Sequence, residues 1–400
     1  MSEHDKTVKK NSTSHKKMRA ATLIKVIKAI REGAKCKNEI QEKTELSWGS
    51  CSETISRLVE NDLLVTHKID DKRGGKGGRK TTTFKFYDDR NLLLGMEIKA
   101  NSILCSLTNF GAEEIHSKKF DFKKTFTQEN IFQVILSTFN EFLDKFKIDK
   151  KDVAGLLLSL TGAVDPDNNR LIYSPRYTDI ADIDFNRFRE FIPSIKYFSI
   201  EHDIHAQASS VVQKNGWTET NFALLHFGEG VGMTIFNDGF YNGAKGFAGE
   251  IGHINHQIKE INKTCTCGRK NCYETILSTS GITELINEIC DSKIESVNEI
   301  TELATTNIQL IDLITNAMVD LIITVSNILN PKAIYIGGEA IEPFIKSVKP
   351  VIEERVKKEA WLGGPEIIRW FSSNDINCAY GTILNSSDKI IEQYITDNLI

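Results

Sequence analysis

The chain has 400 residues, of which 40% are hydrophobic and 26% are charged, so it is long enough for two or three domains with sizeable cores. No apolar run approaches the roughly 20 residues that a membrane helix needs, and the polar first 17 residues lack the apolar segment of a signal peptide. Eight cysteines in so long a chain do not indicate a disulfide scaffold. We therefore expect a cytoplasmic protein without a membrane partner, with a disordered basic tail over residues 1–17.

Charge is unevenly distributed along the chain. The formal net charge is −4, but residues 1–90 carry +8 and the remainder carries −12. A basic segment on an acidic body predicts that only the N-terminal part contacts a polyanion. A solvated charged tail would explain residues 1–20 but not the rest of this segment.

Three helices are predicted near the start of the chain. Apolar residues recur at helical spacing over 18–32, the stretch 37–46 is a short second helix, and 47–64 begins at Ser47, a good N-cap. The short turn before the third helix indicates a helix-turn-helix, whose third helix enters the major groove by its first residues. The candidate DNA contacts on this helix are Trp48, Ser50, Ser52, Ser56 and Arg57.

The stretch that follows, up to residue 87, alternates apolar and polar residues at its two ends and is rich in glycine and cations between them. This pattern predicts a wing, a hairpin whose tip over 72–80 reaches phosphates or a minor groove through Lys76, Arg79 and Lys80. A flexible linker with incidental charge is the alternative. Together with the helices and the local positive charge, the pattern favours a winged helix-turn-helix DNA-binding domain over 18–87.

The body from residue 88 alternates strands and helices, which predicts an α/β fold. Apolar strands with glycine-bearing turns are expected within 91–115, 153–175, 222–243 and 333–340. Helices are expected over 127–147, 203–214, 279–291 and 308–329. Because the strand–turn–strand patterns at 91–115 and 222–243 are similar, we expect a duplicated α/β unit with a ligand-binding cleft between its halves.

Three cysteines lie within the eight residues 265–272, with two histidines upstream. Thiolates and an imidazole suit tetrahedral zinc, which gives the candidate ligand set His253, Cys265, Cys267 and Cys272. The C-x-C step is tighter than the usual spacing, so buried structural cysteines and a redox pair are alternatives. Polar neighbours disfavour the first alternative, and the third cysteine disfavours the second. His256 is interpreted as a surface residue.

Four motifs resemble the signature of the ROK proteins (repressors, open reading frames and sugar kinases), and most of all that of the ROK repressors. They are GFAGEIGHI at 246–254, CTCGRKNCYE at 265–274, IEHDIHAQA at 200–208 and LNPKAIYIGG at 329–338. With the winged helix-turn-helix, the resemblance covers nearly the whole chain. It implies an actin/hexokinase-like (ribonuclease H-like) body, with a small α/β domain over 88–202 plus 382–400 and a large one over 203–381 that carries the zinc motif.

The resemblance also implies a structural zinc ion on the Cys/His set and a sugar bound by carboxylates, which accept strong paired hydrogen bonds from vicinal hydroxyls. In the kinases of the family, the residue that matches Asp203 is the general base. The sugar contacts implied for this chain are Asp203, Glu250, His253 and Glu274.

The phosphate-binding loops distinguish a sugar kinase from a sugar-responsive regulator. Family kinases have an acidic-Gly-Gly-Thr type of turn after the first strand, where this chain has Lys99 and Ala100 in place of both glycines. The second loop has Glu229 where a Thr is usual, and repulsion between unit charges at ~4 Å costs about 4 kcal/mol at an effective dielectric near 20. We therefore expect a non-enzymatic regulator that binds no ATP. An ATP-dependent hexose kinase and a structural zinc protein without a ligand are the alternatives.

The sugar side also departs from the family. His202 stands where an Asn usually precedes the Asp, Arg176 lies near the place of another sugar-contacting Asn, and Gly162 follows a Thr where Pro-Gly is usual. All three are candidate ligand contacts of a small sugar or sugar-phosphate effector. Because arginine favours carboxylate or phosphate over a bare hydroxyl, Arg176 predicts an anionic effector, a sugar phosphate or an acidic sugar. The alternative is that Arg176 points to solvent.

We expect a repressor of carbohydrate-metabolism genes. A sugar in the cleft would close the two halves and change operator affinity by a coupling energy of typically ~1–3 kcal/mol. Because a two-fold operator needs two DNA-binding heads, a homodimer or a dimer of dimers is predicted.

Overall fold

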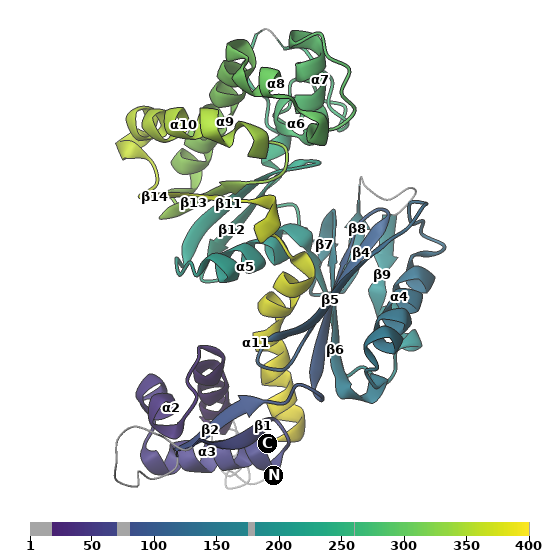
Figure 1. Ribbon diagram of the computed structural model, residues 1–400, viewed down its shortest axis with the longest axis vertical. Helices are drawn as coiled ribbons and strands as arrows, with labels where there is room; N and C mark the ends of the chain where they lie inside the picture. Colours follow the sequence, from purple (N-terminus) through teal and green to yellow (C-terminus); the bar gives the residue numbers. More distant parts are fainter. Residues whose placement is uncertain (1–17, 70–80, 175–180, 260, 400) are drawn as a thin grey trace, which may run out of the picture. The chain divides into compact units, whose positions relative to one another are not determined.

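The computed structural model describes residues 18–69, 81–174, 181–259 and 261–399 (Figure 1). These residues form two compact units. Unit 1 contains the described residues up to 162, together with 166–201 and 378–399, and unit 2 contains 163–165 and 202–377. The predicted tail over 1–17 lies outside the described residues. The domain limits expected from the sequence, at residues 18–87, 88–202 plus 382–400, and 203–381, stay a prediction.

The head of unit 1 has the elements of a winged helix-turn-helix. Its helices are residues 18–31, α2 (Lys37–Thr44) and α3 (Trp48–Glu60), and its antiparallel strands are β1 (Leu64–Ile69) and β2 (Thr81–Phe86). The Ser47 hydroxyl accepts a hydrogen bond from the Ser50 N–H at 3.2 Å, so Ser47 is the predicted N-cap of α3. Such a cap stabilises a helix by about 1 kcal/mol. The predicted wing tip, with Lys76, Arg79 and Lys80, lies outside the described residues.

One apolar core joins this head to the rest of unit 1. Fully buried side chains of the head, such as Ile27, pack in the same cluster as Leu93 and as Ile395 of α11 (Cys378–Asn398). At the rim, the Arg31 guanidinium lies 3.3 Å from Asp388 of α11, and Lys28 Nζ lies 2.6 Å from the other oxygen of the same carboxylate. This junction between the first helix and α11 was not predicted from the sequence.

The body of unit 1 is built on a five-stranded sheet in the order β10-β6-β3-β4-β5. Strands β3, β4 and β5 pair antiparallel, and β6 runs parallel to β3. Every residue of β3 and β6 is buried, as their continuous apolar sequences predict for strands covered on both faces. Helix α11 approaches β3 so closely that a Cβ on Gly95 would lie 1.8 Å from the Ala379 carbonyl oxygen.

The elements of this body are β3 (Leu92–Ile98), β4 (Ser102–Thr108), β5 (Glu114–Asp121), α4 (Ile131–Phe146), η1 (Lys150–Asp152), β6 (Val153–Leu160), β8 (Arg170–Tyr173), β9 (Ala181–Asp184), η2 (Phe185–Phe191) and β10 (Tyr197–His202). Strands β8 and β9 pair antiparallel.

Unit 2 is built on a four-stranded sheet in the order β12-β11-β13-β14. Strands β11 and β12 pair antiparallel, and β13 and β14 run parallel to β11. Each unit therefore begins its sheet with an antiparallel hairpin and then adds a parallel strand, which confirms the predicted repeat. The elements of unit 2 are β7 (Ala163–Asp165), α5 (Asp203–Asn215), β11 (Asn221–Phe227), β12 (Val231–Asn237), η3 (Ile251–His253), α6 (Glu274–Leu277), α7 (Thr279–Ile289), η4 (Val297–Glu299), α8 (Glu302–Thr306), α9 (Ile308–Leu329), β13 (Ala333–Gly337), η5 (Glu342–Phe344), α10 (Ile345–Glu359), η6 (Trp361–Gly363), β14 (Ile367–Phe371) and η7 (Ser373–Asp375).

Helix α9 spans the predicted 22 residues and forms the centre of the unit 2 core. Among the described residues it is the one helix long and apolar enough to cross a membrane by length and composition. Half of its most apolar window is buried inside the unit, and Leu321, Ile322 and Val325 are part of the core. This burial explains the apolar composition as that of a core helix.

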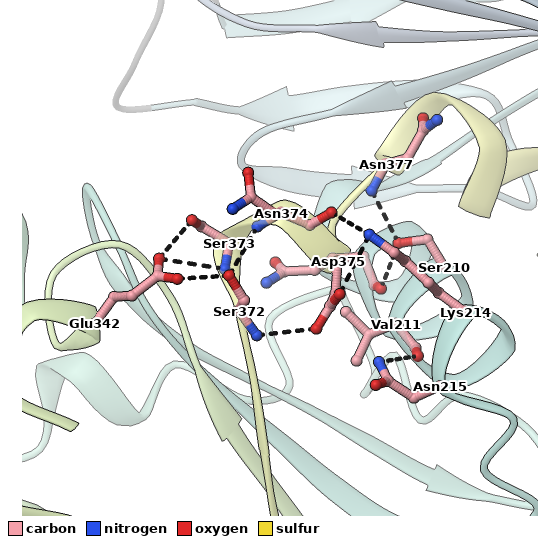
Figure 2. Close-up of polar contacts among 11 residues, drawn as sticks. Ser210, Val211, Lys214, Asn215, Glu342, Ser372, Ser373, Asn374, Asp375 and Asn377 are labelled. Carbon is pink, nitrogen blue, oxygen red and sulfur yellow. Dashed lines mark hydrogen bonds and ion pairs between the residues drawn. The ribbon is translucent and has the colours of Figure 1, made fainter. Parts of the chain in front are cut away.

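A polar network fixes the segment of unit 2 that follows β14 (Figure 2). The hydroxyls of Ser372 and Ser373 each donate to a different oxygen of Glu342, at 2.5 Å. Lys214 of α5 donates to the carbonyl oxygen of Asn374 at 2.5 Å and pairs with Asp375 at 3.2 Å (Figure 2). Residues 372–375, which precede α11 in the chain, are therefore held in unit 2 by side chains of α5 and η5.

Candidate functional site

The loop between η3 and α6 in unit 2 brings His253 and the three cysteines together. An isolated antiparallel bridge joins Asn255 to Cys272 and folds the loop back on itself. The Gly268 N–H donates to the Cys265 carbonyl oxygen at 2.9 Å, and Gly268 has φ +84°, in the left-handed region that favours glycine. This tight turn places the ligand atoms on one side of the loop.

The separations of the ligand atoms suit a tetrahedral ion. The imidazole nitrogen of His253 and the sulfurs of Cys265, Cys267 and Cys272 all lie within 4.8 Å of one another. Two Sγ atoms, those of Cys267 and Cys272, are 3.7 Å apart, and Cys265 Sγ is 3.5 Å from His253 Nδ1. With Zn–S near 2.3 Å and Zn–N near 2.0–2.1 Å, a tetrahedron has edges of about 3.8 and about 3.6 Å. The predicted set therefore forms a group that could hold a metal ion.

The environment shifts the pKa values of the three thiols in different directions. Burial raises the pKa of Cys265, and burial with the neighbouring thiols raises that of Cys272 to about 12. The backbone N–H of Arg269 lowers the pKa of Cys267. A metal ion binds thiolates, so ion binding must displace protons from at least the two thiols whose pKa is raised.

Two carboxylates border the cluster. His253 Nε2, the ring nitrogen that points away from the thiols, lies 3.9 Å from Glu250, whose side chain is half exposed. Glu274 accepts a hydrogen bond from the Thr266 hydroxyl at 3.3 Å, and its carboxylate lies 3.9 Å from Cys265 Sγ. Glu250, His253 and Glu274 are therefore brought together beside the metal group.

His256 is not the surface residue that the sequence suggested. Its side chain is 3% exposed, its Nδ1 accepts a hydrogen bond from the Ile258 N–H at 3.2 Å, and its ring lies edge-on to that of Tyr273. Burial lowers the pKa of His256. The prediction was wrong because the loop folds back over this residue through a backbone bond from His256 to Asn271 at 2.8 Å.

His202 and Asp203 stand at the N-terminus of α5. His202 Nδ1 lies 2.9 Å from Asp203 Oδ1 and 3.3 Å from the Ile204 N–H, which it caps. One nitrogen cannot donate to the carboxylate and accept from the N–H at once, so the tautomer of His202 decides which bond forms. Ile204 packs against Gly232 of β12.

The metal loop contacts the same strand. A Cβ on Gly252 would lie 2.3 Å from the carbonyl oxygen of Val231, which is the residue before Gly232. The start of α5 and the metal loop therefore both border the beginning of β12. Of the other predicted ligand contacts, Gly162 belongs to unit 1 and has φ +121°, and Arg176 lies outside the described residues.

Carboxylates gather at the glycine turns that end β11 and β13. His226 Nε2 lies 3.2 Å from Glu339, which directly follows the Ile-Gly-Gly turn. A Cβ at Gly228 would meet the Glu339 carboxylate at 2.6 Å, and the neighbouring Glu229 is exposed. Sequence reasoning named Glu229 but missed Glu339, although its position after two glycines was visible. In unit 1, Lys99 pairs with Glu97 at 3.3 Å.

The outward face of α3 carries the predicted DNA contacts. Cys51, Thr54, Ile55 and Leu58 are buried, so the opposite face is free of the core of the head. Trp48 is 53% exposed at the first turn of α3, and Lys37 Nζ lies 3.8 Å from the centre of its ring. Ser56 is exposed, whereas Ser50, Ser52 and Arg57 are half-buried.

A family model described as ROK family matches residues 93–384 of this chain. The chain belongs to the ROK family. Among the relatives of this ROK protein, the DNA-binding transcriptional dual regulator NagC of Escherichia coli (strain K12) is 23% identical over an alignment of 341 residues, and the match covers 80% of each chain. The xylose repressor of Bacillus spizizenii is 23% identical and covers 86% of this chain and 89% of its own.

A solved structure of a ROK family transcriptional regulator, described as a homolog of the E. coli MLC protein, shares the fold with a TM-score of 0.75. The two are 19% identical, and the match covers 95% of this chain and 100% of that one. The expected fold class, a winged helix-turn-helix followed by an α/β ROK body, is therefore confirmed.

Proposed function

We propose that this ROK protein is a sugar-responsive DNA-binding transcriptional regulator, in the first place a repressor of carbohydrate-metabolism genes. The observation that carries the proposal is the winged helix-turn-helix whose core continues into a ROK body through Leu93 and Ile395. The relatives named as DNA-binding or sugar-responsive regulators support it. A head that shares its core with the body is placed to respond when the body binds a ligand.

The proposed metal is a structural zinc ion. His253, Cys265, Cys267 and Cys272 would hold it, because three soft thiolates and one imidazole suit zinc and the distances between them suit a tetrahedron. When bound, the ion supplies a crosslink within the loop and no reactive position, since all four ligands come from the protein. It would fix the His253 ring and so orient its other nitrogen toward Glu250.

The proposed effector is a sugar or a sugar phosphate that contacts the carboxylates near the metal loop. Asp203, Glu250 and Glu274 supply acceptors for vicinal hydroxyls, and His202, His253, Gly162 and Arg176 are further candidate contacts. Isothermal titration with neutral and phosphorylated hexoses tests the preference for an anion, which rests on Arg176. Tight binding of a neutral hexose without any preference for its phosphate would refute the anionic effector.

The kinase alternative is disfavoured by the glycine turns of unit 2. A phosphate at these turns would face the carboxylates of Glu229 and Glu339, where an anion is repelled. We therefore propose that the chain binds no ATP and catalyses no phosphoryl transfer. A large thermal shift with ATP, or sugar-dependent ATP consumption, would overturn this part.

DNA binding is tested on the full chain, because the shared core makes truncation of the head disruptive. The variant Ser52→Asp with Ser56→Asp adds two negative charges to the outward face of α3. It should abolish binding to a DNA fragment taken from beside the gene that encodes this chain. Thr301→Asp with Gln309→Asp, at two exposed positions of unit 2, is the matched control with the same added charge. Equal binding by all three proteins would refute the proposed role of α3. Light scattering of the same samples tests the proposed homodimer or dimer of dimers.

A further inference from the structure

The outward face of α3 has a carboxylate at its centre. Four buried residues define the inner face of the helix, and at 3.6 residues per turn the side chain of Glu53 points away from them. Glu53 is exposed, and its neighbours on this face are Gly49 and Ser56. In the part of the chain that the structure describes, no hydrogen bond or ion pair engages the Glu53 carboxylate.

The surroundings of Glu53 are suited to contact with DNA. A shallow groove of about 240 Å³ between the first helix and α3 is lined by Glu53 together with Arg19 and Arg57. Guanidinium groups bind phosphates, so cations flank the carboxylate where the DNA backbone would run. Facing phosphate, the carboxylate would be repelled. It gains a favourable contact only where DNA offers a donor, and in the major groove the donors are the exocyclic amines of cytosine and adenine.

We propose that Glu53 determines operator specificity by accepting a hydrogen bond from cytosine N4 at one position of each half-site. The proposal rests on the proposed DNA-binding function of α3. A carboxylate pairs with cytosine N4, and it is repelled by the acceptor atoms that guanine and thymine present in the groove. Glu53 would thus restrict which sites are bound, and the two arginines would contribute affinity for any sequence.

Position along the helix distinguishes Glu53 from the other exposed carboxylate of α3. At 1.5 Å per residue, Glu53 lies about 8 Å along the axis from Trp48 at the helix start, and Glu60 lies about 18 Å from it. Recognition helices contact base edges with their N-terminal residues, in a groove about 12 Å wide. Glu60 is therefore the matched control: it has the same charge and is also exposed, but it lies outside the N-terminal part of α3 that would contact base edges.

The experiment selects duplexes from a random library with the full chain, with and without a mixture of hexoses and hexose phosphates. The wild type should enrich a two-fold consensus with a fixed cytosine in each half-site. Glu53→Gln should shift that position to adenine, because glutamine pairs with adenine N6 and N7. Glu53→Ala should lose the preference, and Glu60→Gln should retain the wild-type consensus.

Titration of the selected duplex gives the magnitude. Replacing the cytosine should weaken wild-type binding about 5- to 150-fold, and Glu53→Ala should reduce that ratio to near one. A consensus shared by the wild type, Glu53→Gln and Glu53→Ala would overturn this inference alone. A wild type that enriches no sequence would overturn the proposed function and this inference with it. Thermal melting of each variant excludes misfolding as the cause of a loss.

Discussion

Glu201 is a buried carboxyl whose replacement should stabilise unit 1. It is 4% exposed at the end of β10, and its Oε2 accepts a hydrogen bond from Asn385 of α11. Burial raises its pKa to about 8, although bonds from Asn385 and Thr382 act in the opposite direction. Its other oxygen has no partner among the described residues. Glutamine keeps the oxygen that accepts from Asn385 and removes the ionisation.

The pH dependence follows from the raised pKa. Between the unfolded pKa near 4.5 and the folded value near 8, the folded chain keeps a proton that the unfolded chain releases, so stability falls as pH rises through this window. At pH 7 the loss is about 3 kcal/mol, and below pH 4.5 it is absent. Glu201→Gln should therefore gain about 2–3 kcal/mol at pH 7 and little at pH 4.5. At the position of the oxygen without a partner, the protonated Glu201 carries an O–H and the glutamine carries an NH₂. Both leave a buried donor without an acceptor, so this cost in stability is similar in the two proteins.

The assay is urea-dependent hydrogen exchange between pH 4.5 and 8, with rates corrected for intrinsic exchange. It is read by mass spectrometry on peptides from β10 and α11, and on peptides from β13 for the control in unit 2. Glu219→Gln is the control of opposite sign. Burial raises the pKa of Glu219, but bonds from Tyr335 and Arg369 outweigh it and lower the pKa to about 2. Its contribution is present above the unfolded pKa, so Glu219→Gln should destabilise unit 2 at pH 7. Equal pH slopes for the wild type and Glu201→Gln would refute the reasoning.

Three further predictions concern other contacts of the structure. Asp388→Asn removes the ion-pair partner of the Arg31 guanidinium, whose pKa is lowered by burial. It should cost about 1–2 kcal/mol of head stability in a urea titration, and high salt should reproduce part of this loss in the wild type. Gly95→Ala should cost several kcal/mol, because its Cβ would overlap the Ala379 carbonyl, and a normal melting temperature would contradict the close approach of α11. Metal binding should release two or three protons at pH 7 by calorimetry in different buffers, and Cys272→Ser should abolish stoichiometric zinc.

Sequence reasoning succeeded where the cause of a structure is local. The cap at Ser47 and the bounds of α9 follow from nearest neighbours and helical spacing, and both were predicted. The burial of His256 follows from a loop that folds back, and the bond between Glu201 and Asn385 joins residues 184 apart. No periodicity in the sequence carries information about such pairs, because they depend on the register between distant elements.

The same distinction holds for the candidate site. The metal set was predictable because its four ligands fall within residues 253–272 and their chemistry is specific. Chemistry also indicated Glu250 and Glu274, and the loop brings both to the metal group. The Glu339 carboxylate at the glycine turn of β11 escaped notice because β11 and β13 become neighbours only in the folded sheet.

Because the core of the head includes α11 at the end of the chain, it can be completed only late in synthesis. Arg31 and Asp388 are 357 residues apart, so at ~5–20 residues per second a ribosome needs about 20–70 s to deliver the second after the first. Until α11 emerges, the apolar faces of the first helix and α3 lack part of their cover. A polypeptide interrupted before α11 therefore carries all of α3 but only part of the core to which α3 belongs. If α3 binds DNA as proposed, only a chain synthesised as far as α11 would have a completely covered DNA-binding head.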